Sequence, residues 1–190
     1  MVDYKCEDVT HPETDLKIEV YAPQWYKRGH HDDVYSQKVI DSKLTDESDY
    51  FKPYIEHLIQ ELLAEHKIKK ADLIIIIPRS GGTFSPTLEK LGNFLASKFG
   101  GTFDKIIRKK PSDRKNISSS TFSERLKKSE EEFALIRRVG PDEKTIWILD
   151  DQKTTGSTLL VCTQLLKKSR DCEVYCFALS INRNVELFGE

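Results

Sequence analysis

Hydrophobic residues change their spacing several times along the chain after residue 50. Between Phe51 and His66 they recur every three or four positions, as on one face of an amphipathic helix with Asp49 at its N-cap. The run from Leu73 to Ile77 is apolar at every position and is closed by Pro78, which is typical of a strand buried on both faces of a parallel sheet. This part of the chain predicts a helix followed by a buried strand.

The same alternation continues to the end of the chain. Ser85 and Pro86 have the character of an N-cap and a first helical residue, and Gly100-Gly101 is a typical helix stop. The remaining elements are expected as a strand over about 103–108, a helix over 124–136, a strand over 144–149, a helix over 157–169 and a strand over 173–181. Strands that alternate with helices indicate an α/β fold with a mostly parallel sheet flanked by helices.

Residues 1–49 do not share this alternation. They are mostly polar, with one expected strand over 16–21, so we expect an N-terminal cap or hood segment packed on an α/β domain of residues 50–190. A second irregular segment, residues 108–123, is basic and rich in serine. A stretch of that length inside a compact domain is either a functional loop or lacks ordered structure.

Composition narrows the class of protein. The chain has 190 residues, enough for one domain with a core, and 30 basic against 31 acidic residues give a formal net charge of -1. This balance does not indicate a nucleic-acid partner. The longest apolar run is far too short to cross a membrane and no secretory signal is visible, so we expect a cytoplasmic protein without a membrane partner. The spacing of the four cysteines does not match a zinc site.

The most informative segment is the end of the third expected strand and the turn after it. Two adjacent carboxylates, Asp150 and Asp151, follow the apolar strand, and the turn Thr154-Thr-Gly-Ser-Thr158 opens the next helix. Such a turn directs backbone N–H groups, hydroxyls and the positive end of a helix at one point, which is typical of a phosphate site, and Gly156 permits close backbone approach. Because the acids would repel a phosphate, we expect them to accept hydrogen bonds from the vicinal hydroxyls of a ribose phosphate.

This segment resembles the phosphoribosyl pyrophosphate (PRPP) signature of type I phosphoribosyltransferases, which consists of an apolar strand, two acids, two further residues and a Thr-rich turn. The resemblance covers about residues 70–182. It implies that Asp150 and Asp151 hold the ribose hydroxyls and a Mg²⁺ ion, and that the 5′-phosphate is held by the turn residues Thr154, Thr155, Gly156, Ser157 and Thr158. Gln152 and Lys153 stand where the family usually has an apolar pair.

The same resemblance gives a role to the strand end at Pro78. In the family a short loop here binds pyrophosphate through backbone amides and a basic side chain, which assigns the leaving group to Arg79, Ser80, Gly81 and Gly82. Arg79 has the planar fork of donors that this role needs. An ordinary glycine turn is the alternative for this segment taken alone.

A mobile basic loop closes over the pyrophosphate in the family, which makes Lys109 and Arg125 candidate ligand contacts. The spacing from Arg125 to Phe133 also resembles the ComF-type branch associated with competence proteins, although Lys128 stands where that branch usually has Asn. Other folds have less support. The chain carries neither a P-loop nor a G-x-G-x-x-G fingerprint, and its adjacent acids lack the spacing of a haloacid dehalogenase phosphatase.

The resemblance implies a Mg²⁺-dependent enzyme of nucleotide metabolism, in which an unidentified nitrogen acceptor displaces pyrophosphate from PRPP and the catalytic residues are Asp150, Asp151 and Arg79. The alternative is a non-catalytic module that senses PRPP or a nucleotide, or binds a partner, on the same fold. The intact acid pair favours the enzyme, whereas Gln152 and Lys153 favour the module. A homodimer or a larger complex is left open.

Overall fold

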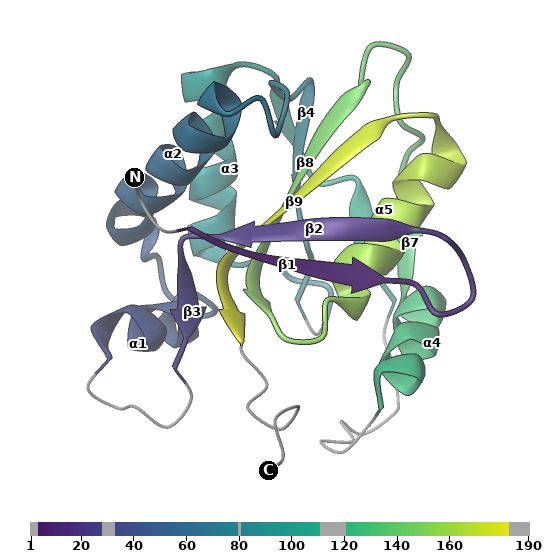
Figure 1. Ribbon diagram of the computed structural model, residues 1–190, viewed down its shortest axis with the longest axis horizontal. Coiled ribbons are helices and arrows are strands. Elements are labelled where there is room, and N and C mark those ends of the chain that lie inside the picture. Colours follow the sequence, from purple (N-terminus) through teal and green to yellow (C-terminus); the bar gives the residue numbers. More distant parts are fainter. Residues whose placement is uncertain (1–3, 28–32, 80, 111–120, 183–190) are drawn as a thin grey trace.

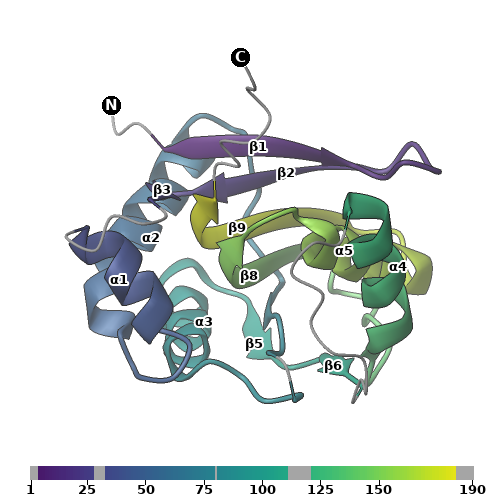
Figure 2. The same cartoon turned by 90° about the horizontal axis from the view of Figure 1, so that it is seen from below.

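A seven-stranded mixed sheet with helices on both faces forms the centre of the protein in the computed structural model (Figure 1, Figure 2). The structure describes residues 4–27, 33–79, 81–110 and 121–182. Its strands are β1 (Lys5–Thr10), β2 (Lys17–Ala22), β3 (Gln24–Tyr26), β4 (Leu73–Ile76), β5 (Thr102–Asp104), β6 (Ile107–Lys109), β7 (Phe133–Leu135), β8 (Thr145–Lys153) and β9 (Glu173–Asn182). Its helices are α1 (Val34–Asp41), α2 (Ser48–Ala64), α3 (Pro86–Phe99), α4 (Phe122–Glu132) and α5 (Ser157–Ser169). The described chain is therefore an α/β fold with a mostly parallel sheet flanked by five helices, which confirms the predicted class.

Two hydrophobic clusters fill the two sides of the sheet. Helices α1, α2 and α3 cover one face, where Leu91 shares a cluster with Ile74 of β4. Helices α4 and α5 cover the other face, where Leu160 shares a cluster with Ile75. Successive side chains of a strand point to opposite faces, which is why adjacent residues of β4 belong to different clusters. All four residues of β4 are buried, as expected for a strand that helices cover on both sides.

The order of the strands places a topological switch point between β4 and β8. The sheet runs β1-β2-β9-β8-β4-β5, and β3 also pairs with β9. From β4 the chain passes through α3 to β5 on one side, whereas β8 and its successor β9 lie on the other side. Ligands of open α/β sheets bind beyond the carboxyl ends of strands at such a point. Because Ile76 pairs with Leu149, the residues after β4 and the end of β8 lie at the same edge.

Three element boundaries differ from the sequence prediction. The strand expected over 103–108 is two short strands, and β6 pairs with β7 in a separate antiparallel ladder. Residues 133–135, expected to end a helix, form β7 because this pairing satisfies their backbone and buries Phe133. Strand β8 runs four residues past its expected end at Leu149, since its polar last residues still pair with β9 as far as Lys153.

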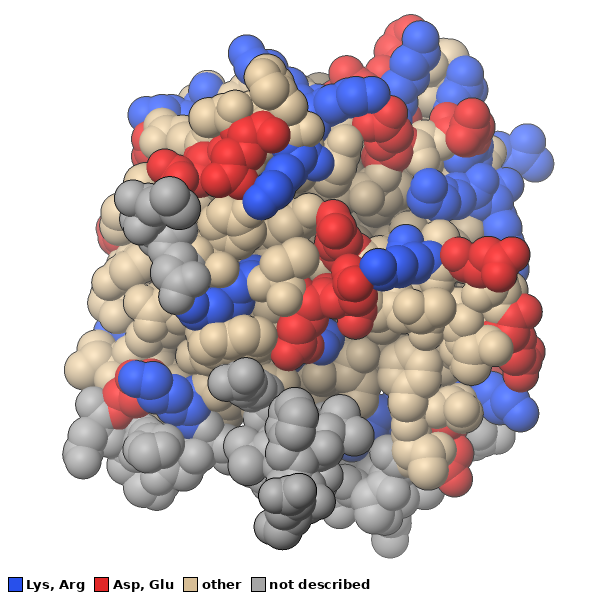
Figure 3. Space-filling model, viewed as in Figure 1, with Lys and Arg blue, Asp and Glu red and all other residues tan. Residues whose placement is uncertain are grey.

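The segment assigned to the N-terminal cap adds three strands to the sheet. Strands β1 and β2 form an antiparallel hairpin in which Val9 lies opposite Ile18, and both side chains belong to the hydrophobic cluster under α5. Strands β2 and β3 then pair in parallel with β9. Figure 3 shows that acidic and basic side chains are interspersed on the face that this hairpin crosses. The hairpin is thus a structural part of the sheet and has a polar outer surface.

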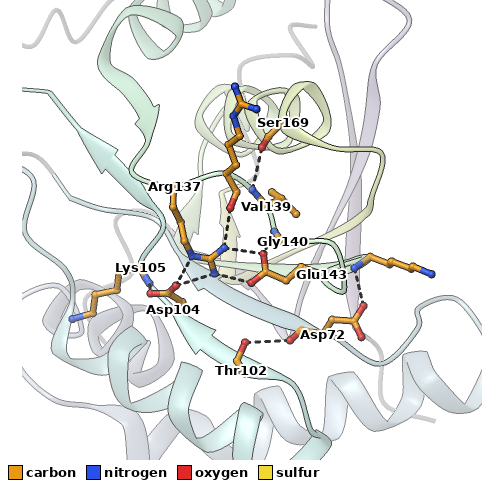
Figure 4. Close-up of polar contacts among 11 residues, drawn as sticks. Asp72, Thr102, Asp104, Lys105, Arg137, Val139, Gly140, Glu143 and Ser169 are labelled. Atoms are coloured by element: carbon orange, nitrogen blue, oxygen red, sulfur yellow. Dashed lines mark hydrogen bonds and ion pairs between the residues drawn. The ribbon is translucent and has the colours of Figure 1, made fainter.

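A polar cluster joins the segments that precede β4 and β8 (Figure 4). The guanidinium of Arg137 donates to Asp104 at 2.9 Å and to Glu143 at 2.7 Å, and this contact lowers the pKa of the Glu143 carboxyl. Asp72 accepts hydrogen bonds from the backbone amides of Lys144 and Thr145 at 2.9 and 2.8 Å. These donors and acceptors satisfy one another, with Asp72 and Glu143 before β4 and β8 and Asp104 at the end of β5, so we assign the cluster a structural role.

Candidate functional site

The two acids that the sequence singles out lie at the carboxyl end of β8, at the switch point. Asp150 pairs with Ala178 of β9, so the strand still holds the backbone of this acid in an extended form. Asp150 lines two cavities, one of about 550 Å³ and one of about 330 Å³, whereas Asp151 lines the smaller cavity. The acid pair therefore stands at the junction of both cavities.

The acid pair is electrostatically unusual. Burial, followed by the negative charge of Asp151, raises the pKa of Asp150 to about 8. Burial also raises the pKa of Asp151, although the positive charge of Lys43 opposes this effect. The backbone amide of Asp151 donates to Oδ1 of Asp150 at 2.8 Å. The raised pKa values mean that the ionised form of both carboxyls is unfavourable in the protein alone. A cation or hydrogen-bond donor that a ligand brings would stabilise this ionised form.

The turn after β8 has the geometry that its sequence predicts. Gly156 is the N-cap of α5 with a φ of +79°, and a Cβ built there would lie 2.5 Å from Cγ2 of Val9 on β1. A side chain is therefore excluded both by the left-handed backbone and by the hairpin. The hydroxyls of Thr155 and Ser157 lie 3.1 Å apart. The amide of Ser157 donates to the Thr155 hydroxyl at 3.5 Å, and the turn places its hydroxyls and the N-terminus of a 13-residue helix at the larger cavity.

The larger cavity brings together most of the predicted phosphate-binding residues. All five turn residues from Thr154 to Thr158 line it, and so do Asp150, Lys109 and Arg125. Lys109 comes from β6 and Arg125 from α4, and both elements precede the turn in the sequence. Residues 111–120 of the predicted basic loop lie outside the described residues. The segment from Thr121 onward is an ordered helix, which begins with a capping box between Thr121 and Glu124.

The loop after β4 carries the residues that the sequence assigns to pyrophosphate binding. Arg79 lines the smaller cavity beside both acids, and its positive charge offsets part of the increase that burial causes in the pKa of Asp151. Gly81 and Gly82 have φ values of +86° and +78°, so they form a turn that favours glycine. The amide of Gly82 donates to the carbonyl of Arg79 at 3.0 Å, and this donor is therefore used inside the turn. Ser80 lies outside the described residues.

Two further charged residues at the site, Lys43 and Glu132, were not predicted. Lys43, from the turn between α1 and α2, has its Nζ 3.9 Å from Oδ2 of Asp151. Glu132 is buried at the end of α4, where its carboxylate lies 3.3 Å from Lys109 and 3.8 Å from Lys128. A lysine in a polar segment and an acid in a charged helix have no local signal of function. Only the packing of α1 and α4 brings them to the cavities.

Lys153 also contributes an interaction that the sequence does not reveal. Its side chain is buried and its ammonium forms an ion pair with Glu7 of β1. The hairpin is therefore joined to the residue that directly precedes the hydroxyl-rich turn. The polar Lys153, which departs from the apolar pair of the resembled family, is accounted for by this contact.

No family model matches the chain, and no curated protein matches it. Within the described ranges, no helix is long and apolar enough to cross a membrane. The function must therefore be argued from the geometry of the acid pair, the turn and the two cavities.

Proposed function

We propose that the protein binds PRPP and transfers its phosphoribosyl group to a nitrogen acceptor. One observation carries this proposal: an acid pair and a hydroxyl-rich helix N-terminus line two cavities that share Asp150, Thr154 and Thr158 at the switch point of an α/β sheet. A phosphate suits the turn, because backbone N–H groups and the helix dipole favour an anion there. A diol suits the acids, because carboxyl oxygens accept hydrogen bonds from hydroxyls.

The charges around the smaller cavity suit the pyrophosphate group. Lys43, Arg79 and Lys109 line this cavity together with Asp150 and Asp151. Pyrophosphate carries several negative charges, and three cations at one cavity would stabilise those charges as the leaving group departs. The larger cavity would hold the 5′-phosphate at the turn, and the ribose would lie between the two phosphate sites, next to Asp150.

The acid pair is also a suitable partner for a divalent cation. Among the described residues no group of three or more His, Cys, Asp or Glu side chains gathers as a metal site. Mg²⁺ does not need such a group, since it is commonly held by one or two carboxylates together with substrate phosphates and water. Asp150 and Asp151 would hold the ion. It would neutralise charge on the pyrophosphate and would favour the ionised form of both acids.

The reaction that this site would support is a displacement at the ribose C1. The bond from C1 to the pyrophosphate oxygen breaks, and its electron pair leaves with the pyrophosphate. The lone pair of the acceptor nitrogen forms the new bond to C1, and a proton from that nitrogen passes to water. The residues contribute by positioning the ribose and by stabilising the leaving charge, which are the main sources of catalysis in such a step.

A non-catalytic PRPP-binding or nucleotide-binding module is the second candidate, and Glu132 favours it. Lys109 and Lys128 share the buried carboxylate of Glu132, whose single negative charge offsets part of their positive charge at the edge of the larger cavity. Lysines that are partly neutralised by the protein itself contribute less to stabilising a leaving group. Both candidates share the same PRPP site, so they differ only in whether pyrophosphate is released.

Calorimetry with PRPP and Mg²⁺ tests the site. We expect D150N/D151N to bind at least about a hundredfold more weakly than wild type, because two charge-assisted hydrogen bonds are lost. The control D142N/D171N removes two exposed acids far from the cavities and should bind as wild type does. Equal affinities of wild type and D150N/D151N would refute the ribose assignment. Pyrophosphate release with a panel of nitrogen nucleophiles then separates the enzyme from the module.

A further inference from the structure

The segment that carries Lys43 is held firmly against the start of α3. The hydroxyl of Ser85, the N-cap of α3, donates to the carbonyl of Ser42 at 2.5 Å. Thr87 donates to the carbonyl of Thr45 at 2.9 Å and accepts from the amide of Glu47 at 2.8 Å. Both Ser85 and Thr87 are buried. Three hydrogen bonds therefore fix the backbone on both sides of Lys43 beside the loop that follows β4.

The side chain of Lys43 extends from this fixed backbone to the acid pair. Its Nζ lies 3.9 Å from Oδ2 of Asp151, and the side chain is 40 % exposed. This distance is too long for a hydrogen bond, so the ammonium and carboxylate attract each other without sharing a proton. In the described part of the chain, Asp151 is the charged partner of Lys43 within 4 Å. The donors of the ammonium remain available to a ligand.

Three basic residues from separate segments meet at the smaller cavity. Lys43 comes from the turn after α1, Arg79 from the loop after β4 and Lys109 from β6. Lys109 is already engaged. Its ammonium lies 3.3 Å from the carboxylate of Glu132 and 5.1 Å from the centre of the Phe133 ring, which is a cation–π contact. Lys43 has no such second partner among the described residues. The ammonium of Lys43 is therefore less engaged than that of Lys109, and its donors are available to a new anion.

We propose that Lys43 binds the diphosphate group of the ligand directly, as a contribution of the N-terminal 49 residues to the site. This inference rests on the proposed function, because it takes the smaller cavity as the place of the pyrophosphate group. The ammonium would donate to phosphate oxygens while it stays close enough to Asp151 to limit the repulsion between that acid and the anion. Lys43 would also bring the first 49 residues into contact with the ligand.

The competing role for Lys43 is indirect. Lys43 lies next to Asp151, and its positive charge lowers the pKa of both acids of the pair. It would then be a positioning residue that acts on the ribose through Asp151 and has no contact with phosphate. The two roles predict different losses when the ammonium is removed. Direct contact with the diphosphate would weaken pyrophosphate binding, whereas a role through Asp151 would also weaken ribose 5-phosphate binding. Inorganic pyrophosphate lacks a ribose, and ribose 5-phosphate lacks a diphosphate.

The experiment measures the affinities of K43M for pyrophosphate with Mg²⁺ and for ribose 5-phosphate, by calorimetry. The control is K90M, which also removes a lysine paired with an aspartate, since Lys90 lies 2.5 Å from Asp46 and lines neither cavity. We expect K43M to weaken pyrophosphate binding at least about tenfold and to change ribose 5-phosphate binding less than about twofold. K90M should change neither, and K43R should restore most of the pyrophosphate affinity.

Two results would overturn the inference and leave the proposed function in place. Pyrophosphate affinity of K43M equal to that of wild type would show that the ammonium does not contact the anion. Equal weakening for pyrophosphate and for ribose 5-phosphate would assign Lys43 to the positioning of Asp151. If wild type binds neither ligand, the proposed function fails and the inference fails with it. Circular dichroism of K43M checks that the fold is retained, as the partial exposure of Lys43 leads us to expect.

Discussion

Asp150 lies at the candidate site, and its ionisation there lowers the stability of the folded protein. Burial and the charge of Asp151 raise its pKa to about 8, from an ordinary value of 3.8. Between these two values the folded protein holds a proton that the unfolded chain has released. The folded state therefore loses stability as the pH rises through this range. An acid that is this costly to ionise without a ligand is more readily explained by binding than by folding.

The pH dependence of stability tests this electrostatic argument. Asn resembles the protonated acid and cannot ionise, so we expect D150N to gain stability over wild type by about 1 kcal/mol for each pH unit between 5 and 7. Urea unfolding at several pH values measures the difference. Parallel stability curves for the two proteins over this range would contradict the raised pKa of Asp150.

Gly156 is the residue at which the backbone of the turn meets the hairpin. We expect G156A to lose about 2–4 kcal/mol, because the new Cβ meets Val9 and the backbone has a positive φ. G81A is the control, since Gly81 has a φ of +86° but no atom within 4 Å of its Cβ position, and its cost should be only about 1 kcal/mol. Urea unfolding of both variants measures these losses. Equal losses would show that contact with Val9 is unimportant.

At the scale of elements, the β1–β2 hairpin supports the hydroxyl-rich turn through two contacts. Val9 packs against Gly156, and Glu7 pairs with the buried ammonium of Lys153. Strand β1, which the sequence does not predict, therefore packs behind the hydroxyl-rich turn. Its outward side carries the exposed ion pair between Lys17 and Asp8, at 2.7 Å. One hairpin thus contains a buried and an exposed ion pair, which can be compared directly.

Removal of the acid from each pair should have very different effects. E7Q leaves the ammonium of Lys153 buried and unpaired, so we expect a loss of about 2–3 kcal/mol in the free energy of unfolding. D8N breaks a solvated pair and should cost less than about 1 kcal/mol. The double variant E7Q/K153M should lose less than the sum of its two single variants. Similar stabilities for E7Q and D8N would mean that the pair between Glu7 and Lys153 is effectively solvated.

Helices and strands could be predicted from the sequence where apolar periodicity and capping residues specify them locally. Apolar periodicity located α2, α3, α5 and the core of the parallel strands, and the capping sequence at Ser85 placed the start of α3. Periodicity failed for Phe133, because a short strand and a helix end have similar local sequences and only pairing with β6 distinguishes them. It also failed at the end of β8, where the hydrogen-bonding partner β9 extends a strand through polar residues.

At the scale of the whole molecule, the strand order explains why the site lies where it does. The pairing of β4 with β8 brings the loop at Arg79 next to the acid pair, although about 70 residues separate them in the sequence. The packing of α1 against the start of α3 then brings Lys43 to the same edge. The smaller cavity is thus assembled from segments that have no local relation to one another.

The amino-acid sequence by itself determined the α/β class, the acid pair and the hydroxyl-rich turn, because each depends on residues within about ten positions of one another. The tertiary structure alone decided the two cavities, the positions of Lys43 and Glu132, and the role of the N-terminal strands in the sheet. These features depend on contacts between distant segments. Such contacts form when the folding chain buries its apolar faces, and no local pattern specifies which polar side chains then meet.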